Sequence, residues 1–171
     1  MSEKVKFDDE LEFAKNLIKP VFTYLKGTPA MSALHVCRGN YTHEESSLLS
    51  GSYEQLSDFF AVVNPDILTL EFSTPRAGEL AALFKNEKVK ENIMLGLGVI
   101  NPRTEEVESV EQIITQVEKA LAYLPADRIW LNPDCGFSTF SKRPMNSFDI
   151  IEKKCQALAA ARDELRKKYA N

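Results

Sequence analysis

The sequence predicts an α/β fold in which one N-terminal helix precedes four strand-helix units. Short apolar segments of strand length alternate along the 171 residues with longer segments in which apolar residues recur at helical spacing. The strand segments, such as residues 67–70 and 93–97, are apolar at consecutive positions rather than at alternate ones. Consecutive apolar positions are typical of parallel strands that are buried on both faces. These two observations predict one domain, residues 1–171, built on a parallel sheet.

The first predicted element is a helix over residues 7–26. It starts at the acidic pair Asp8 and Asp9, which suits the positive end of a helix dipole. Pro20 predicts a disturbance inside this helix, and Gly27 ends it. Its apolar positions recur at helical spacing: Leu11, Ala14, Leu17, Ile18, Val21 and Leu25.

Four strands and four further helices follow in alternation. Strands are expected over residues 32–37, 67–72, 93–100 and 129–132, and helices over residues 53–63, 77–85, 110–124 and 148–169. This (βα)4 pattern is half of a TIM-type (β/α)8 barrel, which takes eight units and about 250 residues. A lone half-barrel leaves two unpaired strand edges and, we expect, an uncovered apolar inner face. We therefore expect a homodimer that completes the barrel, with a separate chain carrying the N-terminal half as the alternative.

Composition and charge exclude several classes of protein. The net charge of −4 and the pI near 5.3 indicate no concentrated basic face for nucleic acid. No apolar run is long enough to span a bilayer, and residues 1–7 lack the apolar segment of a secretory signal. We expect neither nucleic-acid nor membrane partners, and a cytoplasmic location. Three cysteines without an export signal argue against a disulfide framework.

Four residues of metal-ligand type fall at the predicted ends of three strands. His35 and Cys37 lie two apart on one strand, so their side chains project from the same face. Glu71 ends the second strand and Cys135 follows the fourth, and such ends line the active site in β/α folds. One imidazole, two thiolates and one carboxylate suit tetrahedral zinc. The alternative is that the cysteines are small buried residues, which is our interpretation of Cys155 in the last helix.

The ligand segments also resemble a known family. Residues 34–40 (Leu-His-Val-Cys-Arg-Gly-Asn), 70–73 (Leu-Glu-Phe-Ser) and 131–137 (Leu-Asn-Pro-Asp-Cys-Gly-Phe) are similar to the three zinc-ligand segments of the cobalamin-independent methionine synthases. The order of the segments is the same. The match corresponds to the C-terminal half of that family's catalytic barrel and is especially similar to the short, single-barrel members.

The resemblance implies zinc as cofactor and a methyl transfer that gives methionine. The methyl group would pass from a methyltetrahydropteroyl-glutamate, a methyltetrahydrofolate polyglutamate, to the sulfur of homocysteine. We interpret Arg38, Asn40, Ser73 and Arg103 as candidate substrate contacts, with turn formation as the alternative for Asn40. Long members of the family carry a histidine shortly after the third of these strands. Residues 98–104 of this chain contain Arg103 and no histidine.

Three functions are open at this point. The first is a zinc-dependent methyltransferase acting on a thiol, alone or as one subunit of a split enzyme. The second is a zinc- or thiol-binding half-barrel without full catalytic activity, and the third is a degenerate α/β domain. Two nearby residues are ambiguous as well: His43 is a solvated loop residue or part of the site, and Arg76 begins a helix or pairs with a substrate carboxylate.

Overall fold

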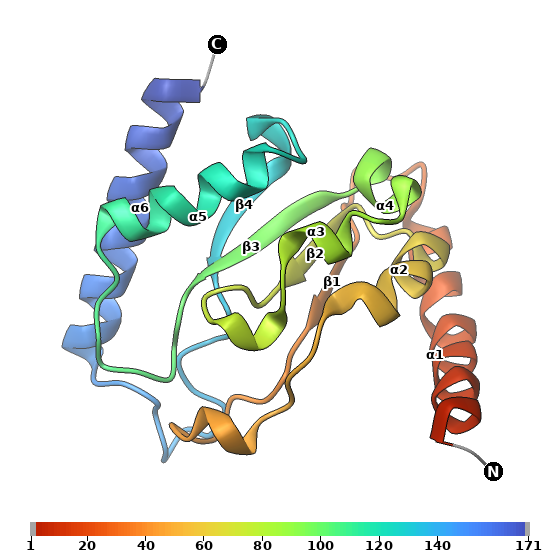
Figure 1. The fold of residues 1–171 in the computed structure, drawn as a ribbon, viewed down its shortest axis with the longest axis horizontal. Helices are drawn as coiled ribbons and strands as arrows, with labels where there is room; N and C mark the ends of the chain where they lie inside the picture. Colours follow the sequence, from red (N-terminus) through yellow and green to blue (C-terminus); the bar gives the residue numbers. More distant parts are fainter. Residues whose placement is uncertain (1–2, 170–171) are drawn as a thin grey trace.

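Four parallel strands form one sheet in the order β1-β2-β3-β4 in the computed structural model, which describes residues 3–169 (Figure 1). The strands are β1 (Ala33–Val36), β2 (Ile67–Leu70), β3 (Met94–Ile100) and β4 (Ile129–Pro133). Each strand pairs with its neighbour in the sequence, so β1 and β4 form the two edges. The predicted α/β class, four parallel strands after one helix, is confirmed.

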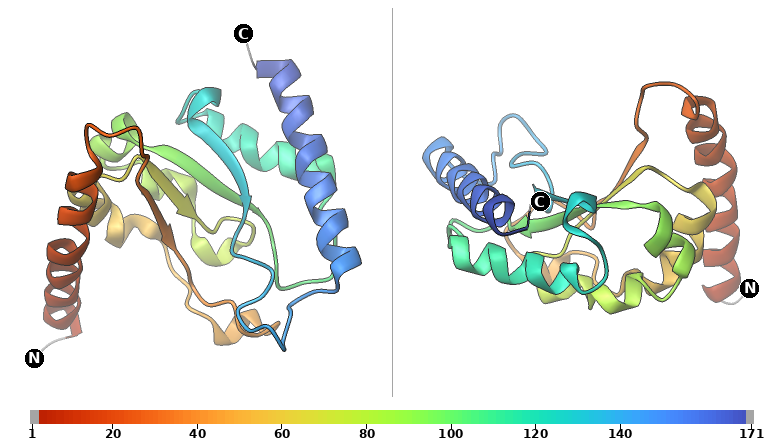
Figure 2. Two further views of the ribbon diagram at one scale, coloured as in Figure 1. Left: turned by 180° about the vertical axis from the view of Figure 1, so that it is seen from behind. Right: turned by 90° about the horizontal axis from the view of Figure 1, so that it is seen from above.

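Helices cover one side of the sheet and stand at its two ends. The α-helices of the described residues are α1 (Glu3–Leu25), α2 (Ser57–Val63), α3 (Leu80–Leu83), α4 (Glu87–Asn92), α5 (Val110–Leu121) and α6 (Phe148–Tyr169). Seen from above, α2 to α5 lie along one side while α1 and α6 flank the sheet at opposite ends (Figure 2). None of these helices is both long enough and apolar enough to cross a membrane.

Two helix predictions are wrong in detail. The helix predicted over residues 77–85 is divided, because Gly78 has a left-handed φ of 75° that ends the 3-10 turn Pro75–Ala77. The helix α3 follows, and the Asn86 side chain then caps α4, an element that the sequence pattern did not predict. The first helix begins at Glu3, four residues before the predicted start, and continues through Pro20.

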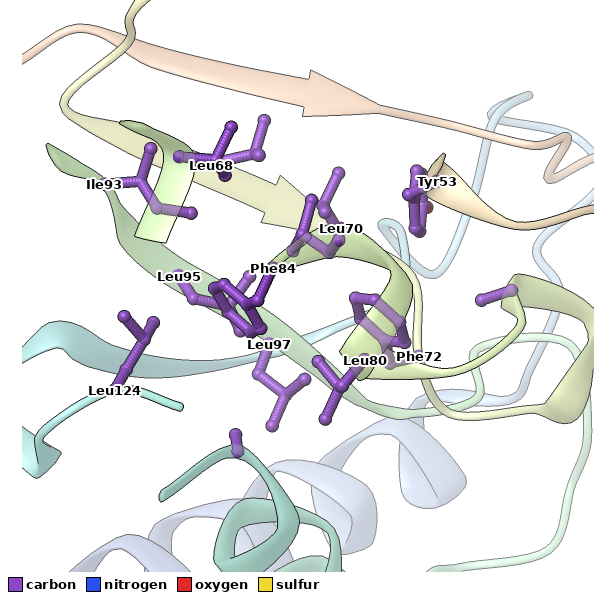
Figure 3. Packing of buried hydrophobic residues seen from close by; sticks show 14 of the residues in the cluster. Tyr53, Leu68, Leu70, Phe72, Leu80, Phe84, Ile93, Leu95, Leu97 and Leu124 are labelled. Carbon is purple, nitrogen blue, oxygen red and sulfur yellow. The ribbon is translucent and has the colours of Figure 1, made fainter. Parts of the chain in front are cut away.

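The core lies between the sheet and the helices that cover it. Leu68 and Leu70 of β2 and Leu95 and Leu97 of β3 are at most 1% exposed and face this layer (Figure 3). Large apolar side chains from the covering segments complete it: Tyr53, Phe60, Leu83, Phe84, Ile113 and Val117. Burial of this much apolar surface is the main contribution that holds the helices on the sheet.

The opposite, inner face of the sheet carries both polar and apolar side chains. The strand register places His35, Thr69, Gly96 and Trp130 side by side on this face, and only Gly96 among them is buried. Two inward positions of β3, Gly96 and Gly98, are glycines, so this strand contributes fewer apolar side chains to the inner face than its sequence suggested. A side chain at Gly96 would meet Asn132 Oδ1 at 2.8 Å, so neighbouring polar groups fill that space. The inner face is therefore polar near His35 and Thr69, while Trp130 and the row Ala33, Ile67 and Met94 keep it apolar elsewhere.

Candidate metal centre

Three metal-ligand side chains meet where β1 and β4 end. The ligand atoms of His35, Cys37 and Cys135 all lie within 4.8 Å of one another, and we call these three residues the donor cluster. Cys135 Sγ is 3.4 Å from His35 Nε2 and 3.3 Å from Cys37 Sγ. Parallel strands end at the same edge of a sheet, which is why residues almost a hundred positions apart are neighbours here.

The surroundings of the donor cluster orient two of its members. His35 Nδ1 lies 3.2 Å from the carbonyl oxygen of Thr69, and a proton on Nδ1 leaves Nε2 free to face Cys135. The backbone N–H of Gly39 donates to Cys37 Sγ at 3.3 Å. His35 and Cys37 are exposed, whereas Cys135 is buried, so the cluster opens to solvent on one side.

Glu71 lies beside the donor cluster rather than within it. Its Oε1 is 3.2 Å from Cys135 Sγ, but Glu71 is not part of the group whose ligand atoms are all mutually close. Glu71 is 1% exposed, and besides this contact its carboxylate accepts hydrogen bonds from two arginines. The backbone N–H of Arg38 donates to Oε1 at 2.8 Å, and Arg76 Nη2 donates to Oε2 at 2.6 Å.

The chemistry of these residues fits a zinc ion. Two thiols and an imidazole are preferred zinc ligands, and their separations are close to those that about 2.0–2.3 Å zinc-ligand bonds require. Burial raises the pKa of the Cys135 thiol, and its contacts with Cys37 and Glu71 raise it further. A divalent cation would favour the thiolate and offset the crowding of acidic groups. The donor cluster, with Glu71 next to it, is therefore suited to hold zinc.

A buried charge network lies next to the donor cluster. Arg103 is 1% exposed, and its Nη2 donates to Asp134 Oδ2 at 3.0 Å while its Nε donates to Glu45 Oε1 at 3.3 Å. Asp134 also accepts the backbone N–H groups of Phe72 and Ser73, both at 3.0 Å. Burial raises the pKa of Asp134, against the opposing effect of the Ser73 hydrogen bonds and Arg103. The network ties together the segments that follow β2, β3 and β4.

The four predicted substrate contacts all have partners inside the chain. The guanidinium of Arg38 lies 4.0 Å from the centre of the Tyr53 ring, and Ser73 Oγ donates to Asp134 Oδ2 at 2.5 Å. Asn40 Nδ2 donates to the carbonyl oxygen of Gly136 at 2.6 Å, which joins the loops after β1 and β4. With Arg103 buried in its network, these residues shape the site, and their contact with a substrate stays a prediction.

Sequence reasoning missed the roles of Asp134 and Arg76. Asp134 directly precedes Cys135, and an aspartate beside a ligand was the available signal. Arg76 pairs with Glu71 because the short turn after β2 folds back toward it, a direction that sequence separation does not reveal. The packing role predicted for Cys155 is wrong, since Cys155 is exposed along a groove between α5, α6 and β4. His43 is exposed as well, and its Nδ1 lies 2.5 Å from the carbonyl oxygen of Arg103.

Comparison with known proteins decides the family. Residues 30–148 match the model of the catalytic domain of the cobalamin-independent synthases. The chain belongs to the cobalamin-independent methionine synthase family. The 5-methyltetrahydropteroyltriglutamate–homocysteine methyltransferase of Bacillus licheniformis is 31% identical over 124 residues, and the methionine synthase of Pyrococcus furiosus is 29% identical over 143 residues.

Solved structures of this family share the fold. A B12-independent methionine synthase from Shewanella sp. W3-18-1, solved in complex with selenomethionine, matches 95% of this chain with a TM-score of 0.76 at 21% identity. The chain spans 45% of that protein, 37% of the Pyrococcus furiosus synthase and 16% of the Bacillus licheniformis enzyme. The family fold is therefore present here as a half-barrel, over less than half of each relative's length.

Proposed function

We propose that this chain is the zinc-binding half of a methyltransferase that transfers a methyl group to the sulfur of homocysteine. The observation that carries the proposal is the donor cluster of His35, Cys37 and Cys135 at the carboxyl ends of the strands. The printed names of the relatives, which include homocysteine methyltransferase and methionine synthase, support the same reaction. A methyltetrahydropteroyl-glutamate is the proposed methyl donor.

The proposed ligands have two roles: three residues hold the metal, and a fourth gives up its place to the substrate thiol. His35, Cys37 and Cys135 would hold zinc, which when bound supplies a Lewis acid that lowers the pKa of a thiol. Glu71 is the metal ligand that a substrate thiol would replace, because both of its carboxylate oxygens have other partners nearby. In the proposed reaction the homocysteine thiol loses its proton, and its sulfur forms a bond to the methyl carbon. The bond between that carbon and the nitrogen of the methyltetrahydropteroyl-glutamate breaks, and the nitrogen takes up a proton.

A second candidate function is zinc and thiol binding without methyl transfer. It is favoured by the segment after β3, where the chain has the buried Arg103 and no histidine between residues 98 and 104. Both candidates predict thiol binding at the metal, and only turnover with a methyl donor separates them.

The test of the proposed site is homocysteine binding to zinc-loaded protein. At saturating homocysteine, X-ray absorption at the zinc edge is expected to show one more sulfur neighbour of the zinc ion. About one proton per chain is expected to be released on binding. Methionine, which has no thiol proton, is the matched control ligand and is expected to change neither signal. An unchanged zinc environment with homocysteine contradicts the proposal and favours a structural metal.

The sheet has two unpaired edges, β1 and β4, and a closed (β/α)8 barrel would need four more strands between them. We propose that a complementary segment of four strands closes the barrel on the open side of the sheet, whichever polypeptide carries it. A second copy of this chain is the alternative that the sequence pattern favoured.

A further inference from the structure

We propose that Arg76 is a positioning residue that holds the Glu71 carboxylate at the margin of the donor cluster and retains it when a thiol takes its place. The inference rests on the proposed zinc site and extends it to a residue outside the ligand set. In this proposal, how readily a thiol replaces the carboxylate at the metal depends on the ion pair between Arg76 and Glu71.

The geometry of the pair carries the proposal. Arg76 Nη2 and Glu71 Oε2 are 2.6 Å apart, and the two side chains are only 7% and 2% exposed. Shielding from water strengthens an ion pair at this distance, because solvent screens the attraction much less. Arg76 Nη1 also donates to the carbonyl oxygen of Leu49 at 3.2 Å, so the guanidinium is fixed before it meets the carboxylate.

The second oxygen of Glu71 points the other way. Oε1 accepts the backbone N–H of Arg38 at 2.8 Å and lies 3.2 Å from Cys135 Sγ. The carboxylate therefore bridges the guanidinium on one side and the donor cluster on the other. Because Arg76 stays in place, Glu71 can leave a cation without becoming a buried charge that has no partner. Arg103 Nη1, at 3.7 Å from Oε2, adds a second and weaker attraction.

These contacts weigh against the other role considered for Arg76, direct binding of a substrate carboxylate. Nη2 is taken by Glu71 and Nη1 by Leu49, and the remaining Nε is buried. A guanidinium engaged in this way is poorly placed to form the paired hydrogen bonds that recognise a substrate carboxylate.

The test compares zinc and thiol affinities in Arg76→Gln, Arg76→Lys and the wild-type chain. Zinc affinity is measured by competition with a chromophoric chelator, and thiol affinity by titrating homocysteine and 2-mercaptoethanol into zinc-loaded protein. In Arg76→Gln, zinc affinity is expected to rise and the affinity for both thiols to fall about tenfold, because Glu71 then stays with the cation. Arg76→Lys keeps the charge with fewer donors and is expected to lie between the two.

Two further variants separate the pair from general effects of charge. In a Glu71→Ala background, Arg76→Gln is expected to have no further effect on thiol affinity, since no carboxylate remains to be held. Arg128→Gln is the matched control, because Arg128 donates to the carbonyl oxygens of Ile93 and Lys90 at the opposite end of the sheet. It is expected to leave both affinities unchanged.

Several results would overturn the inference. A loss confined to homocysteine would mean that Arg76 contacts the amino-acid part of the substrate. If Arg76→Gln lowers thiol affinity equally in the Glu71→Ala background, only the charge of Arg76 matters. If thiol affinities are unchanged in both Arg76 variants, Arg76 has a purely structural role. A wild-type chain that binds no zinc would refute the proposed site together with this inference, whereas intact zinc and homocysteine binding with indifferent Arg76 variants would refute the inference alone.

Discussion

At the scale of single residues, Gly98 links the sheet to the metal centre. A Cβ atom at this position would lie 2.3 Å from Asp134 Oδ1 and 2.7 Å from the carbonyl oxygen of Leu70. The neighbouring backbone cannot move away cheaply, so Asp134 would have to give up its place beside Ser73 and Arg103. The φ of Gly98 is not in the left-handed region, so backbone conformation does not require a glycine here. The close approach of Asp134 and Leu70 does.

Gly98→Ala is therefore expected to destabilise the chain by about 2 kcal/mol through overpacking, and to weaken zinc binding by shifting the segment that carries Cys135. Urea unfolding measures the first effect and chelator competition the second. Gly136→Ala is the control, because a Cβ there would meet nothing within 4 Å. Equal stability and zinc affinity for the two variants would show that Asp134 is not held as described.

At the scale of elements, the strand pattern predicted the sheet well and the turns poorly. Runs such as residues 67–70 are apolar at three of four positions and largely buried, so their position and parallel pairing could be predicted from burial. The division of residues 75–92 into three short pieces depends on the left-handed Gly78 and the cap at Asn86, which a helical spacing of apolar residues conceals. The donor cluster could be predicted because strand ends converge. The ion pairs of Arg76 and Arg103 could not, because they depend on side-chain direction.

One pair of residues fixes the start of edge strand β1 and predicts a pH dependence. The Asp66 carboxylate accepts the backbone N–H and the hydroxyl of Ser32, both at 2.7 Å, and these hydrogen bonds lower the pKa of Asp66. A carboxyl with a lowered pKa in the folded state stabilises the fold above its unfolded pKa, near 3.9, and loses that contribution as the pH falls.

Asp66→Asn is thus expected to cost about 0.5–1 kcal/mol at pH 7, discounted for the exposure of Asp66, and progressively less below about pH 4. Denaturant unfolding at several pH values measures the difference between the variant and the wild-type chain. Asp127→Asn, at an exposed aspartate without a side-chain hydrogen bond in the described part of the chain, is expected to show no such trend. A cost for Asp66→Asn that grows toward low pH would contradict this role.

At the scale of the whole molecule, helices at both ends of the sheet limit how the barrel can close. In a (β/α)8 barrel one helix lies over each junction between neighbouring strands. Here α1 precedes β1 and α6 follows β4, so two copies would place α6 of one and α1 of the other over the same junction. A complement that begins and ends with a strand avoids this conflict.

We therefore expect the purified chain to form no discrete dimer. Light scattering at micromolar concentration measures the mass, for which a single chain contributes 19.3 kDa. The exposed apolar side chains of α1, such as Phe13, Leu17 and Val21, are expected to favour weak, concentration-dependent association instead. A stable species of twice the chain mass would contradict the helix argument and restore the homodimer as the closed barrel.

The central claim is that the donor cluster holds zinc, and elemental analysis of metal-replete protein tests it most directly. About one zinc per chain is expected for the wild type, with most of it lost in the Cys37→Ser, Cys135→Ser double variant because two of the three clustered donors are gone. Cys155→Ser, which changes an exposed thiol outside the cluster, is expected to keep the full content. A wild-type chain without zinc, or a double variant that retains all of it, would contradict the claim.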